Sequence, residues 1–261
     1  MSEKIFPKKS LGQNFLRNQS LLNKIVEQCD PLGGKNVLEI GAGMGDLTKT
    51  ILRQNPKKLI AADLDERCVN AVRAKLGERE NLTIILGDAL KIDEKELFGD
   101  EKFSIVSNLP YNISMVLLFK WLNNCLEYIE QAVLLLQKEA ADRISSPKGR
   151  KEYGKISVLC QYLSDVKKRF DISPGSFFPP PKVMSTVVKL VPKHNIDPLQ
   201  KKRLFDAASL AFCRRRKTLA NNLKDRYGNV ANVLAGMGFR PDARAENLSP
   251  EDFVRLSEEL A

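Results

Sequence analysis

The sequence predicts an α/β protein with a mainly parallel sheet, followed by a small all-α region. Two observations carry this prediction. Short apolar strands alternate with helical patterns through the first two thirds of the chain, and the pattern becomes wholly helical after residue 198. Because alternating strands and helices build parallel sheets with helices on their faces, we place an α/β domain at residues 1–192 and a helical domain at residues 193–261.

Composition narrows the class of protein. A chain of 261 residues can bury a full core, and 43% hydrophobic with 28% charged content is that of a soluble globular protein. The net charge of +10 favours a polyanionic partner, nucleic acid before an anionic membrane surface. The sequence shows no membrane span and no signal peptide. We therefore expect a cytoplasmic protein that does not bind membranes.

Metal and histidine chemistry have few residues to use. The five cysteines are scattered without the paired spacing of a zinc site, and His194 is the only histidine. We expect reduced thiols, no metal and no histidine-based triad.

Taken in order, the chain opens with a polar and basic stretch, residues 8–16, that leads into a helical pattern over residues 21–26. Apolar runs then predict strands at residues 37–40, 59–63, 83–88, 103–106 and 131–136, with a last strand at 186–191. The carboxyl ends of parallel strands meet at one edge of a sheet, so the loops that follow these strands should face one crevice.

A glycine motif, residues 41–45, comes directly between the first of these strands and a helix that begins at Asp46. Glycines there allow a tight turn and a close approach of the backbone to a nucleotide-like ligand. A dinucleotide fingerprint would need its third glycine at Asp46. The pattern of Glu39 followed by Gly41, Gly43 and Gly45 instead resembles the first motif of Rossmann-like S-adenosylmethionine methyltransferases.

Two more acidic residues end neighbouring strands. Asp63 is placed to accept both ribose hydroxyls, and Asp88 could accept from the adenine amino group of the cofactor. Asp63 alone would more often be a solvated turn residue, but it stands in series with Glu39 and Asp88. S-adenosylmethionine carries a cationic methionine tail and no pyrophosphate, so acidic groups near the glycine loop suit it.

The fourth strand runs into Asn108-Leu109-Pro110-Tyr111, and a helix follows. An asparagine carbonyl and a backbone carbonyl can accept both hydrogens of an exocyclic amine, Pro110 stiffens the loop, and Tyr111 offers a face for stacking. The alternative is a turn in which Asn108 caps the helix and Tyr111 packs in the core. Convergence of this loop with the glycine loop and both aspartates favours the amine site.

Two aromatic residues precede a proline run in the stretch 173–183. Such a run is extended and stiff, so it can hold a ring in a fixed orientation. We expect Phe177 to form the opposite face of a stacking sandwich with Tyr111, whereas Phe178 fits the pocket and the core equally well.

Two basic regions are candidates for contact with RNA phosphates. One is the polar loop 142–155 with Arg150 and Lys151, and the other is the helical tail with Arg214, Arg215, Arg216 and Lys217. An arginine-rich helix is often only a solvated face. In a chain of net charge +10, RNA contact is favoured.

Motifs along almost the whole chain resemble those of the ribosomal RNA adenine dimethyltransferase family. They are Gly12–Leu16, Gly41–Gly45, Gly87–Ala89, Asn108–Ser114, Tyr153–Lys155, Phe177–Val183 and Arg214–Leu219. The combination is highly specific, although the glycine motif alone is not. Within the family, the chain is most similar to bacterial enzymes that dimethylate two adjacent adenosines in a hairpin loop near the 3′ end of 16S small-subunit ribosomal RNA.

The resemblance implies S-adenosylmethionine as cofactor and small-subunit ribosomal RNA within the immature 30S particle as partner. The cofactor residues that it implies are Asn14, Leu16, Gly41, Asp63, Asp88 and Asn108, to which we add Gln13, Glu39, Gly43 and Ala89. The implied target pocket is made of Asn108, Leu109, Pro110 and Tyr111 with Phe177. Asp63 stands where many relatives carry glutamate, yet its side chain should still reach the ribose. No long exposed apolar stripe argues for a dimer, so we expect a monomer.

Three alternatives stay open. A dimethyltransferase of large-subunit RNA that confers antibiotic resistance shares the fold, but the Phe177–Val183 stretch and the helical tail favour the small-subunit enzyme. A DNA adenine methyltransferase would hold an amine in the same way. The chain could also act chiefly as a ribosome-assembly factor, with catalysis secondary.

Overall fold

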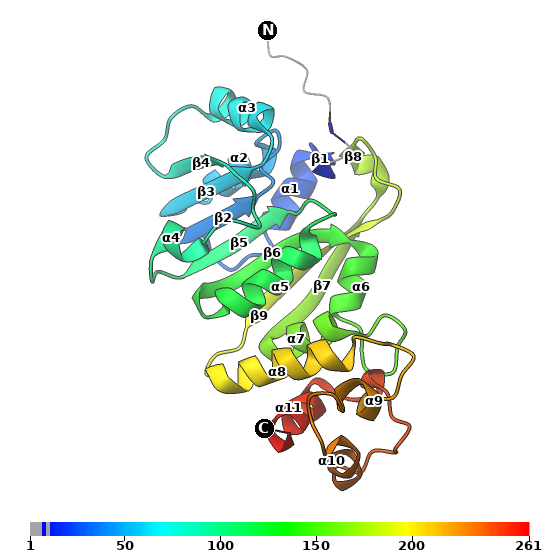
Figure 1. The fold of residues 1–261 in the computed structure, drawn as a ribbon. Coiled ribbons are helices and arrows are strands. Elements are labelled where there is room, and N and C mark those ends of the chain that lie inside the picture. Colours follow the sequence, from blue (N-terminus) through cyan, green and yellow to red (C-terminus); the bar gives the residue numbers. More distant parts are fainter. Residues whose placement is uncertain (1–6, 9–10, 261) are drawn as a thin grey trace. The chain divides into compact units, whose positions relative to one another are not determined.

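The computed structural model describes residues 7–8 and 11–260, which form two compact units (Figure 1). The first unit runs to residue 141 and takes in residues 167–192, and the second comprises residues 142–166 and the chain from residue 193. The chain leaves the first unit for the last time at residue 192. Residues 142–166, expected in the first domain, belong to the second unit, because helix α7 (Lys155–Leu163) contacts α8 (Pro198–Ala211) and α11 (Pro250–Glu259).

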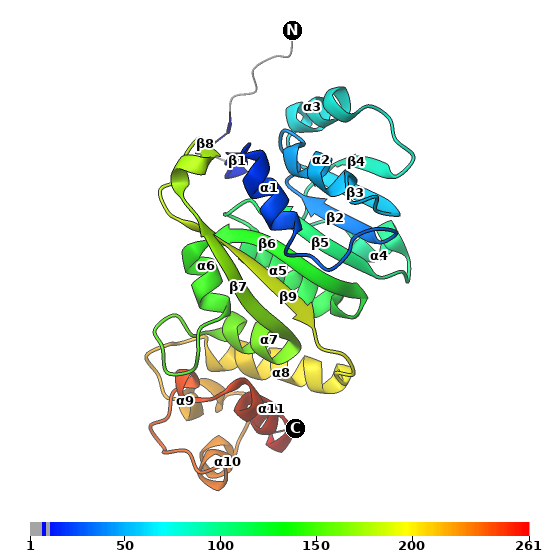
Figure 2. The same ribbon diagram turned by 180° about the vertical axis from the view of Figure 1, so that it is seen from behind.

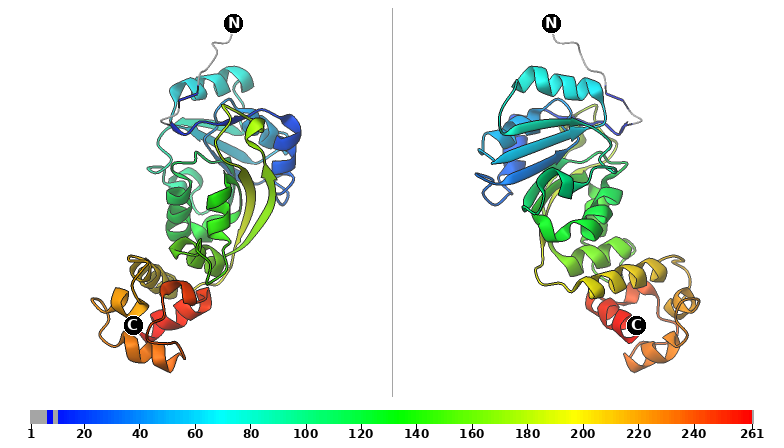
Figure 3. Two further views of the ribbon diagram at one scale, coloured as in Figure 1. Left: turned by 90° about the vertical axis from the view of Figure 1, so that its right-hand side faces the viewer. Right: turned by 60° about the vertical axis from the view of Figure 1, so that its left-hand side comes forward.

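The first unit is built on a twisted seven-stranded sheet (Figure 3). Its order is β4 (Leu82–Leu86), β3 (Lys58–Asp63), β2 (Asn36–Ile40), β5 (Phe103–Asn108), β6 (Ile129–Gln137), β9 (Ser185–Pro192) and β7 (Ser164–Ile172). The pairings from β4 to β6 are parallel, and β9 is antiparallel to β6. The predicted mainly parallel sheet is therefore confirmed, with all six predicted strands in it.

Strand β7 was not predicted. Its residues Ser-Asp-Val-Lys-Lys-Arg-Phe-Asp-Ile are mostly charged, and only its first and last residues are fully buried. β7 is an edge strand of the sheet. Charged side chains are typical of sheet edges because they discourage pairing with other chains, and they hide the apolar alternation by which strands are recognised.

Helices cover both faces of this sheet. On one face lie α1 (Gln19–Val26) and α2 (Asp46–Leu52), and on the other lies α5 (Ser114–Asn124) (Figures 1 and 2). The remaining helices of the first unit are α3 (Glu66–Leu76), α4 (Glu94–Phe98) and α6 (Lys138–Ile144), the last of which continues into the second unit. β2 is buried along its whole length, as expected for a parallel strand covered on both faces.

A second, two-stranded sheet ties the amino-terminal segment to the aromatic stretch. β1 (Phe15–Leu16) pairs antiparallel with β8 (Phe177–Phe178), so that Phe15 lies opposite Phe178 and Leu16 opposite Phe177. Successive residues of a strand point to opposite faces. Leu16 and Phe177 consequently enter the same buried core cluster.

The second unit is helical, as predicted for the tail. Besides α7, α8 and α11 it contains α9 (Leu219–Leu223) and α10 (Val230–Gly236). Side chains of Asp197, Thr218 and Ser249 cap the amino ends of α8, α9 and α11. Tyr153 is fully buried, its hydroxyl donates to the Leu248 carbonyl at 2.9 Å, and its ring meets that of Phe212 edge-on.

Candidate active site

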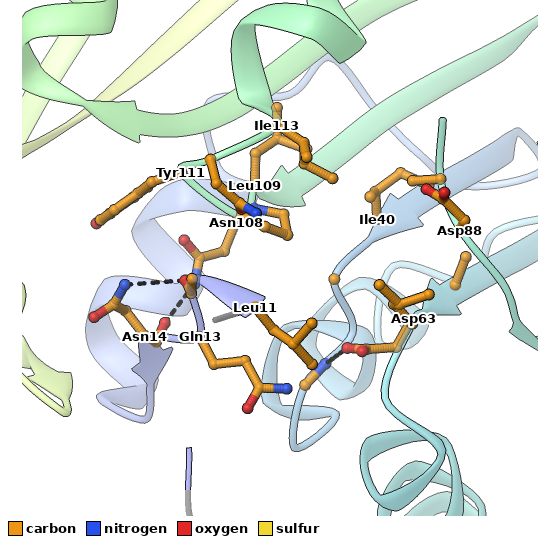
Figure 4. Close-up of a pocket in the computed structure, with 18 of the residues that line it drawn as sticks. Leu11, Gln13, Asn14, Ile40, Asp63, Asp88, Asn108, Leu109, Tyr111 and Ile113 are labelled. Atoms are coloured by element: carbon orange, nitrogen blue, oxygen red, sulfur yellow. Dashed lines mark hydrogen bonds between the residues drawn. The ribbon is translucent and has the colours of Figure 1, made fainter. Parts of the chain in front are cut away.

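A cavity of about 210 Å³ opens at the carboxyl ends of the parallel strands (Figure 4). Its walls come from the ends of β2, β3 and β5, from the loop after β4, and from the amino-terminal segment Leu11–Phe15. The predicted residues that line it are Gln13, Asn14, Gly41, Gly43, Asp63, Asp88, Ala89, Asn108, Leu109, Pro110 and Tyr111. The structure thus brings together eleven residues that lie as far as 98 positions apart in the chain.

The glycine loop packs directly on the walls of this cavity. Gly41 and Gly43 have φ of +77° and +54°, a region that side-chain-bearing residues rarely adopt. A Cβ atom at Gly41 would lie 3.2 Å from Cδ of Pro110, and one at Gly43 would lie 2.9 Å from a ring carbon of Phe15. Glycine is therefore required at both positions, and the glycine loop and the Asn108–Tyr111 loop are in contact.

Asp63 is held in a fixed orientation at the end of β3. Its Oδ2 accepts from the Gly43 amide at 2.8 Å, and its Oδ1 accepts from the Asp65 amide at 2.9 Å. Burial raises the pKa of Asp63, against the effect of these two hydrogen bonds. Each oxygen has a second lone pair, so the carboxylate can still accept two hydroxyl groups.

Asp88 lies in the loop after β4, two residues beyond the end of the strand. Its Oδ1 accepts from the Leu90 amide at 3.0 Å, which leaves Oδ2 as an acceptor for a ligand. Asp88 and Asp63 lie at the same end of the cavity, away from Tyr111 (Figure 4). The two carboxylates can therefore bind two parts of one nucleoside.

Glu39 lies beside this cavity rather than in it. Together with Leu16, it lines a smaller cavity of about 30 Å³. Four residues line both cavities: Phe15, Gly41, Gly43 and Asn108. Glu39 is 1% exposed, and its Oε2 has no hydrogen-bond partner in the part of the chain that the structure describes. Burial raises its pKa to about 8. A buried carboxyl oxygen without a partner is costly, and a cationic ligand would satisfy it.

Asn108 stands where the two cavities meet. Its Nδ2 donates to the Asn14 carbonyl at 3.0 Å, and Nδ2 of Asn14 donates to the Gly12 carbonyl at 3.1 Å (Figure 4). Only the nitrogen of an amide can donate to a carbonyl. These bonds therefore set the orientation of the Asn108 amide and leave its Oδ1 as the acceptor.

Tyr111 is fixed at its far end. Its hydroxyl oxygen lies 2.5 Å from Oγ of Ser185, the first residue of β9, and Oγ of Ser114 donates to its carbonyl at 3.2 Å. Burial raises the pKa of the Tyr111 hydroxyl. The ring is only partly buried and lines the cavity, so a face remains for a ligand.

Gln13 makes a side-chain hydrogen bond that was not predicted from the sequence. Its Nε2 donates to Oδ2 of Asp65 at 3.1 Å. Arg67 binds the same carboxylate and, with Gln13, holds the pKa of Asp65 well below its usual range. Gln13 therefore links the amino-terminal segment to the end of β3 as well as lining the cavity.

Phe177, expected to stack on the target base, lies in the core in this structure. It is 5% exposed, it belongs to the core cluster, and it is absent from the described lining of both cavities. Phe178 is 49% exposed, and the guanidinium of Arg17 lies 5.3 Å from the centre of its ring. The reason is local, since a two-residue strand must turn one aromatic ring inward and the other outward.

The predicted RNA-binding residues all belong to the second unit and are exposed. They occupy two segments, the loop after α6 with Arg150 and Lys151, and the turn after α8 with residues 214–217. The two segments are joined: Arg215 donates from one guanidinium nitrogen to the carbonyls of Lys151 at 2.5 Å and Tyr153 at 3.2 Å. The exposed basic side chains of the two segments therefore belong to neighbouring parts of the second unit.

Among residues 7–8 and 11–260, no group of three or more His, Cys, Asp or Glu side chains is arranged to hold a metal ion. No helix within those residues has the length and apolarity needed to cross a membrane.

Comparison with known proteins agrees with this geometry. The model of the family described as "Ribosomal RNA adenine dimethylase" matches residues 6–261. A protein of Xanthobacter autotrophicus named "Ribosomal RNA small subunit methyltransferase A" is 39% identical over 257 residues, covering 97% of this chain and 89% of its own. A protein of the same name from a Wolbachia of Drosophila simulans is 41% identical, covering 96% and 92%.

Solved structures show the same fold. A dimethyladenosine transferase of Plasmodium falciparum superposes with a TM-score of 0.77 at 29% identity, covering 94% of this chain and 96% of its own. The 23S rRNA methyltransferase ErmE superposes with a TM-score of 0.72 at 24% identity, covering 95% and 99%.

Proposed function

The chain belongs to the ribosomal RNA adenine dimethylase family, and we propose that it dimethylates two adjacent adenosines in the 3′-terminal hairpin loop of 16S small-subunit ribosomal RNA. The product is N6,N6-dimethyladenosine, and the methyl donor is S-adenosylmethionine. One observation carries the chemistry: the acceptor oxygen of Asn108 is held at the junction of two cavities. The small-subunit assignment is supported by two relatives named "Ribosomal RNA small subunit methyltransferase A", which are 39% and 41% identical to this chain.

The two cavities suit the two ends of the cofactor. In the larger, Asp63 would accept from the ribose hydroxyls and Asp88 from the adenine amino group, with Ala89 beside the ring. In the smaller, the unpaired oxygen of Glu39 would accept from the methionine ammonium. Gln13, Asn14 and Leu16 support this cradle from the amino-terminal segment. When bound, the cofactor supplies an electrophilic methyl group on a sulfonium.

The Asn108–Tyr111 loop would hold the acceptor base. The target adenosine must leave its stack, at a cost of a few kcal/mol, and its ring then lies on Tyr111. Oδ1 of Asn108 and the Leu109 carbonyl accept the two amine hydrogens and direct the nitrogen lone pair at the methyl group. Pro110, packed on Gly41, keeps this loop close to the cofactor. The ring of Phe177 is buried in the core cluster, and its stacking on the opposite face of the base stays a prediction that substitution of Phe177 tests.

Catalysis in this arrangement is alignment rather than proton abstraction. Amide and carbonyl oxygens are weak bases, so Asn108 and Leu109 orient the amine and do not deprotonate it. The amine nitrogen becomes acidic only as its new bond forms, and its proton can leave late. For the second methylation, the pocket must accept an amine with one hydrogen fewer, and one acceptor bond is lost.

RNA binding is assigned to the exposed basic residues of the second unit, Arg150, Lys151, Arg214, Arg215, Arg216 and Lys217. The attraction is charge-driven and largely insensitive to sequence. We propose that the partner is the immature 30S particle, met in the cytoplasm by a monomeric enzyme.

Transfer of labelled methyl groups from S-adenosylmethionine tests the proposal. Immature small subunits that lack the modification are compared with large subunits and with duplex DNA. Label recovered as dimethyladenosine from the small subunit alone is the expected result. Label in the large subunit or in DNA would refute the substrate, and tight binding to small subunits without label would make the protein an assembly factor on a methyltransferase fold.

A further inference from the structure

A buried ionic network lies behind the adenine end of the larger cavity. Glu94, the first residue of α4, is 2% exposed, and its Oε1 accepts from Nζ of Lys120 at 2.8 Å and from the indole nitrogen of Trp121 at 2.7 Å. Lys120 and Trp121 are neighbours on α5. A buried ion pair adds little stability by itself, because desolvation offsets most of its attraction. The other hydrogen bonds of Lys120 therefore indicate the role of the pair.

Those other contacts all reach the loop that begins at Asp88. Nζ of Lys120 also donates to the carbonyl of Ala89 at 3.2 Å and to the carbonyl of Ile92. An ammonium has three hydrogens. All three are therefore used on residues 89–94, and the side chain of Lys120 is 16% exposed.

One of these bonds leads to the ligand-binding carboxylate itself. The peptide unit between Ala89 and Leu90 has its carbonyl bound by Lys120 and its N–H bound to Oδ1 of Asp88. Hydrogen bonds in such a chain polarise and orient one another. Lys120 is thus linked, through a single peptide unit, to the carboxylate of Asp88, which lines the cavity.

The same helix carries the acceptor side of the reaction. α5 begins at Ser114, whose Oγ donates to the Tyr111 carbonyl at 3.2 Å, and Lys120 lies further along it. A rigid helix therefore connects the amine-holding loop to the adenine-holding loop. Displacements of about 1 Å between reacting groups can cost on the order of a hundredfold in rate.

We propose that Lys120 is a positioning residue that fixes the Asp88–Ile92 loop and, with it, the adenine end of the cofactor relative to the target amine. Glu94 holds the ammonium in place, and Trp121 holds Glu94. The proposal rests on the proposed placement of adenine at Asp88. It assigns a role to three residues that are absent from the described lining of both cavities.

The test compares variants by calorimetric binding of S-adenosylhomocysteine, which needs no RNA. Lys120→Met alone leaves the Glu94 carboxylate buried without its counter-ion, so it should lower the melting temperature. The double variant Lys120→Met with Glu94→Gln removes both charges and keeps an acceptor for Trp121, so the melting temperature should recover. Affinity for S-adenosylhomocysteine should stay about tenfold weaker in both, because the loop carbonyls have lost their donor.

A matched control and a steady-state measurement separate positioning from folding. Lys58→Met removes a lysine that donates to the Leu97 carbonyl of the same helix α4, at 3.1 Å, and it should bind S-adenosylhomocysteine within about twofold of the wild type. In methyl transfer, the double variant should raise KM for S-adenosylmethionine about tenfold and also lower kcat, because the cofactor is less well aligned with the amine, while KM for RNA changes less than about twofold.

Several outcomes would overturn the proposal. Cofactor affinity that recovers together with the melting temperature would reduce the network to a folding element, and so would an equal loss in Lys58→Met. In an Asp88→Asn background, the Lys120→Met and Glu94→Gln changes should cause little further loss, since Lys120 acts through Asp88; full additivity would contradict the link through the Ala89–Leu90 peptide. A protein that binds S-adenosylhomocysteine as expected but does not methylate small subunits would refute the proposed substrate and leave this inference standing.

Discussion

At the residue scale, Glu39 combines a structural cost with a proposed binding role. Its carboxyl is buried, one oxygen lacks a partner among the described residues, and burial raises its pKa from 4.5 to about 8. Between these values the folded protein holds a proton that the unfolded chain has released. The free energy of unfolding therefore falls as the pH rises through this window, by up to about 1.4 kcal/mol per pH unit.

Glu39→Gln removes this dependence. Relative to the wild type, the variant should gain stability from pH 5 to pH 8 and no more above that, by a few kcal/mol in total. Urea unfolding of both proteins across this range measures the difference, in which other titrating groups cancel. A constant difference would mean that the carboxyl is not protonated in the folded protein.

The same variant should bind the cofactor less well. Ionised Glu39 would attract the methionine ammonium, so wild-type affinity for S-adenosylhomocysteine should rise from pH 6 to pH 8, whereas Glu39→Gln should stay flat and be about tenfold weaker at pH 8. Equal affinities at pH 8 would remove Glu39 from the binding site.

The two aromatic residues of β8 offer a matched pair. Phe177 lies in the core and Phe178 is exposed. Phe177→Leu should cost about 1 to 2 kcal/mol of stability by its change of shape in the core. If Phe177 also stacks on the target base, transfer should fall by a further tenfold or more, measured at a temperature where the variant is fully folded.

Phe178→Leu is the control for that loss. It should leave stability nearly unchanged and transfer within about twofold of the wild type, because its ring is exposed at the surface, where it faces the guanidinium of Arg17. A greater loss of transfer in Phe178→Leu than in Phe177→Leu would move the stacking role to the exposed ring.

At the scale of elements, Arg215 has two functions to separate. Its guanidinium joins the loop after α6 to the turn after α8 through two backbone carbonyls, yet it keeps its charge. Arg215→Glu should weaken RNA binding at 0.1 M salt by about tenfold and reduce the slope of log K against log salt by about 1. Arg226→Glu makes the same charge change on an exposed residue after α9, so it is the control. An unaltered slope in Arg215→Glu would exclude the turn from the interface.

The helices and strands also show which parts of the fold can be predicted from the sequence. The central strands and the glycine loop were predictable because buried parallel strands are apolar along their length and positive φ demands glycine. The edge strand β7 was not, since its charges hide its alternation. The inward turn of Phe177, the bond from Gln13 to Asp65 and the contacts of Lys120 depend on residues distant in sequence. Such pairings leave no local pattern to detect.

At the scale of the whole molecule, the proposed roles fall on different units. The residues around the cofactor and the amine belong to the first unit, and the basic residues assigned to RNA belong to the second. Substitutions in one unit should therefore leave the activity of the other intact, since sites that share no partner residues act independently.

Asn108→Ala tests this separation from the catalytic side. The variant removes the acceptor oxygen that aligns the amine, so transfer should fall by about two to three orders of magnitude or more. Binding to immature small subunits should remain within about twofold, because no basic residue is changed. Added in excess, the inactive variant should therefore compete with the wild type for its substrate and inhibit labelling.

The double variant Arg214→Glu with Arg216→Glu should show the opposite behaviour. It should bind S-adenosylhomocysteine normally but fail to compete with the wild type for small subunits. Unchanged turnover in Asn108→Ala would refute its role in alignment, and an Asn108→Ala variant that cannot compete would show that RNA binding depends on the amine pocket itself.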